Sequence, residues 1–109
     1  MAYSERLASR IRNILGEDED VDERNMFGGL AFMVRGHMCC GLIRDDVMLR
    51  LGADRAEDAL RERHVRPMDF TGRPMKGYVF VSAPGVKTDA KLARWLRLAR
   101  EFIETLPPK

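Results

Sequence analysis

Residues 26–51 are MFGGLAFMVRGHMCCGLIRDDVMLRL, and this stretch decides the fold that the sequence predicts. It holds three apolar runs of five or six residues, at positions 30–34, 38–43 and 47–51. Only two short polar breaks separate these runs, and runs of this length divided by two-residue breaks are typical of consecutive β-hairpins. Helices would need longer segments. We therefore predict an antiparallel meander with turns at Gly36-His37 and Asp45-Asp46.

The predicted pairing distributes the side chains over two faces that are both largely apolar. Directly paired residues share a face, so Met33 is expected beside Cys40. One face then carries Ala31, Met33, Met38, Cys40, Leu42, Val47, Leu49 and Leu51. The other carries Leu30, Phe32, Val34, Cys39, Gly41, Ile43, Met48 and Arg50. An antiparallel sheet with one face in water alternates more cleanly than this, so either helices cover both faces or another chain covers one.

Three helices are predicted around this meander. Ser4 is expected to cap a first helix that ends at Gly16. Asp54 and Glu57 resemble a capping box that opens a short helix ending at about residue 63. The last helix begins at Thr88 and has the clearest period in the chain. Its apolar stripe consists of Leu92, Trp95, Leu96, Ala99, Phe102, Ile103 and Leu106.

The remaining segments complete an α+β fold of two layers. Residues 21–27 are expected to form a polar edge strand, and residues 77–82 form a strand by their β-branched and aromatic content. Residues 64–76 contain two prolines and a glycine, so we expect them to be mostly irregular, with a brief strand at 68–70. The predicted architecture is a central antiparallel sheet, made of the 21–51 meander and the 77–82 strand, with flanking helices.

Composition places the chain among ordinary globular proteins. It has 109 residues, of which 45% are apolar and 33% are charged, and we expect one domain over residues 1–109. No apolar run reaches the length of a membrane span, and the N-terminal segment MAYSERLASR lacks the hydrophobic region of a secretory signal. Two adjacent cysteines give no disulfide framework, so we expect a cytoplasmic protein that makes no membrane contact.

The charges are unevenly distributed along the chain. Residues 17–23 hold six acids and no base, and the other 11 acids stand against 19 Lys and Arg, a balance of +8. The favoured interpretation is a solvated acidic loop on a mildly basic domain. The alternative is a basic surface that meets nucleic acid or an acidic partner.

Three side chains of the meander suggest chemistry, and each has a plainer interpretation. Neighbouring residues on a strand point to opposite faces, so the thiols of Cys39 and Cys40 are not expected to share a metal or a bond. We interpret them as buried, inert thiols, with redox sensing as the alternative. His37 is expected in a solvent-exposed turn, with no serine or carboxylate at a spacing that forms a nucleophilic set. The sequence therefore predicts no catalytic residue, metal site or cofactor.

Residues 66–77, RPMDFTGRPMKG, are the candidate segment for binding an anion or a partner. Three cations surround one acid there: Arg66, Arg73 and Lys76 around Asp69. The favoured alternative is a rigid cover over an edge of the sheet. In that case its three large apolar residues pack inward: Met68, Phe70 and Met75.

Several of these motifs together resemble the N-terminal domain of TfoX/Sxy-type proteins. They are NMFGG at 25–29, GHMCCG at 36–41, the 66–77 segment, and the closing Trp95 with LPPK at 106–109. The resemblance covers nearly the full length and implies a central antiparallel sheet with flanking helices, as in secretion chaperones. It also implies a role like that of the name-giving members, which regulate natural competence and promote transcription, and it carries over no catalytic residue. The chain ends at Lys109, before the C-terminal helical domain of the longer regulators.

These observations favour a non-enzymatic regulatory or protein-interaction domain. We expect the three helices to cover one sheet face, which leaves an apolar patch on the other as the candidate interaction surface: Leu30, Phe32, Val34, Ile43 and Met48. A homodimer or a different protein is the expected occupant. Two alternatives stay open. One is a nucleic-acid-binding domain that uses the 66–77 segment and the last helix. The other is a small-ligand binder or enzyme with a site under the loop of residues 64–77.

Overall fold

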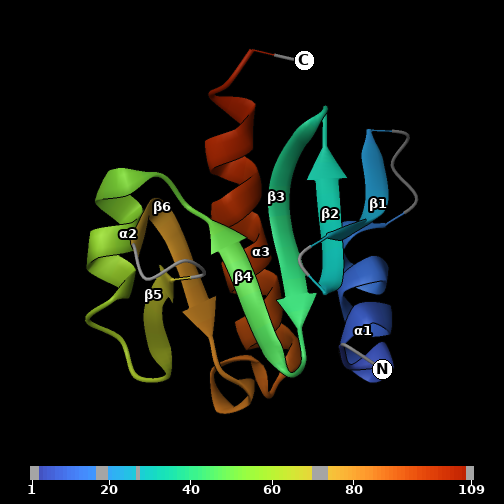
Figure 1. Cartoon of the computed structure of the whole chain (residues 1–109), viewed down its shortest axis with the longest axis horizontal. Helices are drawn as coiled ribbons and strands as arrows, with labels where there is room; N and C mark the ends of the chain where they lie inside the picture. The colour runs from blue at the N-terminus through green and yellow to red at the C-terminus, as the bar shows by residue number, and fades with distance from the viewer. Residues whose placement is uncertain (1–2, 17–19, 27, 70–73, 108–109) are drawn as a thin grey trace.

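The computed structural model describes residues 3–16, 20–26, 28–69 and 74–107, and within them six strands form one antiparallel sheet (Figure 1). The strands are β1 (Val21–Met26), β2 (Gly29–Val34), β3 (His37–Ile43), β4 (Asp46–Arg50), β5 (Val65–Asp69) and β6 (Pro74–Val81), in the spatial order β1-β2-β3-β4-β6-β5. The helices are α1 (Glu5–Leu15), α2 (Ala53–Ala59) and α3 (Asp89–Glu104), with a short 3-10 helix, η1 (Ala83–Val86), before α3. The predicted α+β class is confirmed.

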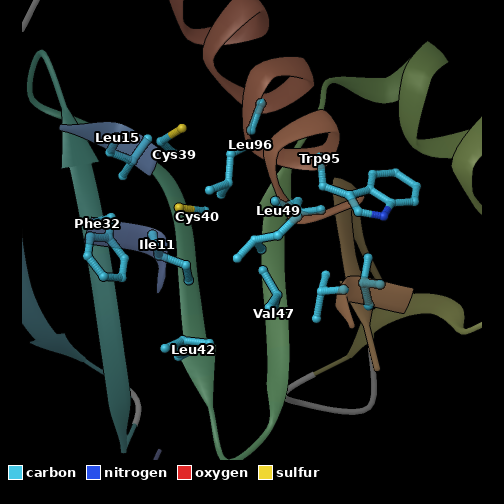
Figure 2. Close-up of a cluster of buried hydrophobic side chains, with 14 of the residues drawn as sticks. Ile11, Leu15, Phe32, Cys39, Cys40, Leu42, Val47, Leu49, Trp95 and Leu96 are labelled. Carbon is cyan, nitrogen blue, oxygen red and sulfur yellow. The ribbon is translucent and has the colours of Figure 1, made fainter. Parts of the chain in front are cut away.

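All three α-helices cover the same face of the sheet. Their buried side chains join those of the strands in one hydrophobic core, part of which Figure 2 shows. The helical members of this core are Leu7, Ala8, Ile11 and Leu15 from α1, Ala56 and Ala59 from α2, and Leu92, Trp95, Leu96, Ala99 and Ile103 from α3. The opposite sheet face carries a separate, smaller cluster that contains no described helical residue.

Side-chain caps fix two of the helix N-termini where the sequence predicts them. The hydroxyl oxygens of Ser4 and Thr88 each accept the N–H three residues further on, at 3.2 Å in both cases. The predicted capping box at Asp54 is wrong. Helix α2 follows Gly52, whose φ of 86° favours glycine and which has no side chain to offer as a cap.

Both hairpin turns lie one residue earlier than predicted. Val34 pairs with His37, so the first turn is Arg35-Gly36 rather than Gly36-His37. The φ angles of these two turn residues are 55° and 84°, and two positive values are what a type I′ turn requires. The second turn is displaced in the same way and is Arg44-Asp45 rather than Asp45-Asp46.

A β-bulge at Cys39 reverses part of this displacement. Met33 pairs with Met38 and Phe32 pairs with Cys40, so Cys39 has no paired residue on β2. An extra residue of this kind interrupts the alternation of side chains along its strand. Both cysteines consequently lie in the core under the helices, which corrects the prediction that their thiols point to opposite faces.

The bulge exchanges the two faces of β2, whereas the displaced turn alone moves each pair by two positions and leaves the faces unchanged. Leu30, Phe32 and Val34 lie in the helix-covered core instead of on the opposite face. Side chains alternate with a period of two, so a shift of one residue relative to β3 is enough to move the whole set.

The region predicted as mostly irregular, residues 64–76, is largely the hairpin of β5 and β6. Pro67 lies on β5, which is an edge strand, and Pro74 is the first residue of β6. Edge strands and strand starts are the positions of a sheet that tolerate a missing N–H. The prolines are therefore compatible with strands here.

The two edges of the sheet are β1 and β5. The sequence of β1 is VDERNM, with the charged residues Asp22, Glu23 and Arg24 in a row. This confirms the polar edge strand predicted at 21–27, except for Phe27, which lies outside the described residues. The guanidinium of Arg12 donates two hydrogen bonds of 2.8 Å to the Glu23 carboxylate and so joins α1 to this edge.

Replacing Gly29 with alanine is expected to destabilise the domain by about 2–3 kcal/mol. An added Cβ would lie 2.1 Å from the carbonyl oxygen of Leu42, and relief would require β2 to separate from the backbone of β3. Gly28 is the matched control, since its added Cβ meets nothing within 4 Å and only its φ of 75° is unfavourable, at about 1–2 kcal/mol. Urea unfolding of both variants measures the difference. A Gly29→Ala variant no less stable than Gly28→Ala would contradict the β2–β3 register.

Candidate interaction surface

The candidate site is the sheet face that no described helix covers, called here the helix-free face. Its cluster contains three buried side chains, Met48, Met68 and Phe80. Three half-buried side chains pack around them: Met38, Ile43 and Tyr78. These residues come from β3, β4, β5 and β6, so the cluster extends across four neighbouring strands.

Methionine supplies half of this cluster. Met38, Met48 and Met68 are unbranched and have polarisable sulfur atoms, so they adapt to differently shaped partners. The residue opposite Met48 on β6 is Phe80, and sulfur–aromatic packing is favourable. The surface therefore combines aromatic anchors with adaptable side chains.

Two arginines border the helix-free face. The Cζ atom of Arg66 lies 4.9 Å from the centroid of the Phe80 ring, and its Nη2 donates a 2.7 Å hydrogen bond to Asp46. The Cζ atom of Arg50 lies 5.6 Å from the rings of both Tyr78 and Phe102. Each guanidinium thus has cation–π contacts that hold it beside the aromatic side chains.

The structure divides the predicted interaction surface between the two sheet faces. Ile43 and Met48 belong to the helix-free cluster. Leu30, Phe32 and Val34 are buried under the helices, with exposed fractions of 6%, 0% and 2%. The expectation that these five side chains share an exposed patch is wrong because β2 is shifted by one residue from its predicted register. Met38 on β3 was missed for the same reason.

The predicted anion-binding segment is described only in part. Arg66 is engaged by Asp46 and also donates a 3.2 Å hydrogen bond to the Ser82 hydroxyl. Lys76 is exposed on β6. Arg73 and the side chain of Asp69 lie outside the described part of the chain, so the anion site stays a prediction.

The alternative interpretation of this segment, an inward-packed cover, is confirmed at one position and wrong at another. Met68 is 1% exposed and lies in the helix-free cluster. Met75 is 39% exposed, so it does not pack inward. Phe70 lies outside the described residues.

His37 is buried rather than exposed in a turn. It is the first residue of β3 and is 8% exposed, and its Nε2 lies 2.6 Å from the carbonyl oxygen of Pro107. This contact connects Pro107, in the segment after α3, to the first residue of β3. The buried position follows from the turn, which ends one residue earlier than the sequence predicts.

The two cysteine thiols have unequal acidity. A hydrogen bond from Cys40 lowers the pKa of Cys39, and the positive charges of Arg100 and Arg50 lower it further against the opposing effect of burial. The same hydrogen bond, together with burial, raises the pKa of Cys40 well above its ordinary value. Cys39 is the more acidic thiol of the pair.

Two further findings concern the described residues alone. They contain no group of three or more His, Cys, Asp or Glu side chains placed to hold a metal ion. None of the helices in this part of the chain is both long enough and apolar enough to span a bilayer.

Comparison with known proteins identifies a family for this chain. The family model of the TfoX N-terminal domain matches residues 13–103, which is most of the chain. Comparisons with curated proteins and with solved structures returned no significant match.

Proposed function

We propose that this chain, which belongs to the TfoX N-terminal domain family, is a non-enzymatic protein-interaction domain with a regulatory role. Membership of this family supports a role connected with competence, which is the uptake of DNA by cells. The protein would act in the cytoplasm. Residues 1–109 would act as one domain, and the helix-free face would be its binding surface.

The uneven covering of the sheet carries this proposal. The three helices lie on one face and bury its side chains in the main core. The other face keeps Met38, Ile43 and Tyr78 half-buried around a buried apolar centre. The partly exposed apolar rim around the buried centre still contacts water in the free protein. A bound partner would exclude that water from the apolar side chains.

The composition of the helix-free face favours a protein partner over nucleic acid. Aromatic residues, methionine and arginine are the residue types enriched in protein–protein interfaces. Its two arginines are already held by aromatic rings, and Arg66 is also neutralised by Asp46. Phosphate binding would require cations that are free to release counterions.

Replacing Ile43 with glutamate is expected to weaken complex formation about tenfold or more. The side chain is half-buried in the helix-free cluster, so the variant should stay folded while a carboxylate occupies the binding surface. Leu60→Glu is the matched control, because Leu60 is an exposed apolar residue, 39% accessible, outside that cluster. Sedimentation equilibrium at micromolar concentration measures self-association, and chemical crosslinking in extracts of the native cells compares complexes with other proteins.

Loss of a complex in Ile43→Glu but not in Leu60→Glu would support the proposal, and the sedimentation data would show whether the partner is a second copy. Equal behaviour of the two variants, whether both bind or both fail, would contradict it. A complex that both variants keep and that salt weakens steeply would indicate nucleic acid instead.

A further inference from the structure

A pocket lies at the end of the molecule where α1 begins. It has a volume of about 720 Å³, and its walls come from the start of α1, the β3–β4 turn and the segment from η1 to the start of α3. These segments lie together at the lower end of the molecule in Figure 1. We propose that this pocket, called here the α1 pocket, binds a small organic phosphate monoester through Arg6, Arg10 and Lys87.

The α1 pocket is separate from the surface used in the proposed function. None of its described lining residues belongs to the helix-free cluster. Binding of a small molecule here and binding of a protein on the helix-free face can therefore be tested independently of each other.

Arg10 is the fixed cation of the α1 pocket. Its Nη2 donates hydrogen bonds of 2.9 and 3.4 Å to the carbonyl oxygens of Val86 and Lys87, and its Nε donates one of 3.0 Å to Asp89. The side chain is 24% exposed, and its third nitrogen, Nη1, makes no hydrogen bond to any residue that the structure describes. A planar guanidinium that is held through two nitrogens keeps the third in a fixed position. Arg10 thus retains two N–H donors for a ligand without having to reorganise.

Arg6 and Lys87 add two positive charges that lie on different elements. Both side chains are exposed, and neither forms an ion pair within the described part of the chain. The acids of the pocket are fewer, because Asp89 is paired with Arg10 and only Asp45 remains without a described cation. The lining residues therefore carry a net positive charge, and a bound anion would give the two free cations a partner.

Charge and size together favour a phosphate monoester over other anions. A monoester carries about −1.5 to −2 charges at pH 7 and has three acceptor oxygens, which matches two free cations and the unused donors of a third. A carboxylate or a sulfate ester has a single negative charge and matches the two free cations less well. The volume exceeds that of a phosphate group alone, and Leu7, Ala83 and Val86 add apolar surface for an organic substituent.

The test titrates isotope-labelled protein with phenyl phosphate at constant ionic strength and follows the backbone amide signals by NMR. We expect saturable shifts at the residues that line the α1 pocket, and about tenfold weaker binding of phenyl sulfate, which has a similar shape and one charge fewer. Arg6→Gln and Lys87→Gln should each weaken the binding of phenyl phosphate about tenfold, since each removes a charge-assisted contact. Asp45→Asn should tighten it about threefold, because a like charge is removed from the pocket.

Arg61→Gln is the matched control for the two cation variants. Arg61 is an exposed cation after α2 that does not line the pocket, so its replacement should leave the affinity unchanged. All four substituted side chains are exposed, and the amide spectrum of each variant verifies that it is folded.

Three results would overturn the proposal. The first is a wild-type spectrum that millimolar phenyl phosphate leaves unchanged or shifts only at residues outside the pocket. The second is an equal loss of affinity in Arg61→Gln and Arg6→Gln, which would indicate general attraction to a basic protein. The third is equal binding of phenyl sulfate and phenyl phosphate, which would exclude selection of a monoester.

Discussion

Replacing Phe32 with glutamate will prevent the domain from folding. Phe32 is fully buried, and Figure 2 shows it beside Ile11 and Leu15 of α1. A carboxylate at this position would lose its hydration without gaining a described partner cation in the core. The expected loss exceeds about 5 kcal/mol, which is comparable to the whole stability of a typical domain. Circular dichroism of the purified variant, with urea unfolding of the wild type as reference, measures it.

The neighbouring residue provides the control for this prediction. Met33 lies on the same strand, one position further, and is only half-buried. Met33→Glu can direct its charge to water on the helix-free side, so it should remain folded with a loss of about 1–2 kcal/mol. If the two glutamate variants were equally stable, the assignment of Phe32 to the helix-covered face would be wrong.

Replacing Trp95 with alanine is expected to lower the free energy of unfolding by about 3–5 kcal/mol. The indole is 3% exposed and belongs to the main core, where α3 packs on the sheet (Figure 2). Truncation would leave a cavity that the surrounding strands and helix cannot fully close. Urea unfolding monitored by circular dichroism gives the value, because the variant lacks the tryptophan fluorescence of the wild type.

Arg94→Ala is the control for this prediction, because it removes the charged group stacked on the Trp95 ring and keeps the indole in the core. The Cζ atom of Arg94 lies 4.7 Å from the Trp95 ring, and its guanidinium donates hydrogen bonds of 3.0 and 2.9 Å to Glu62. Both side chains of this ion pair are more than 40% exposed, so its removal should cost about 1 kcal/mol or less. A loss below about 1 kcal/mol for Trp95→Ala would place the indole on the surface instead.

The last helix and the number of strands in the meander could be predicted from sequence, because each depends on a long or repeated pattern. The stripe through Leu92, Leu96 and Ile103 repeats over four turns, and a displacement of one residue does not hide it. The strand register depends instead on single residues. Arg35 and Arg44 both adopt a φ of 55°, which arginine rarely does, and nothing in their sequence marks them as turn residues.

The bulge at Cys39 had the largest effect on the predicted site. A bulge adds one residue to one strand only, and the apolar run at 38–43 looks the same with or without it. The sequence therefore predicted the presence of an apolar sheet face but assigned β2 to the wrong one. The β5–β6 hairpin was a different case, since Pro67 and Pro74 are acceptable on an edge strand and at a strand start.

The two edges of the sheet limit the ways in which another strand could be added to it. A partner strand that joined β1 would run alongside Asp22, Glu23 and Arg24, and one that joined β5 would meet Pro67, which has no N–H to donate. Both edges therefore discourage growth of the sheet by strand addition, the route that leads to open-ended fibrils. Under the proposed function, a partner bound across the helix-free face would cover that face completely, so the assembly would close at a fixed size.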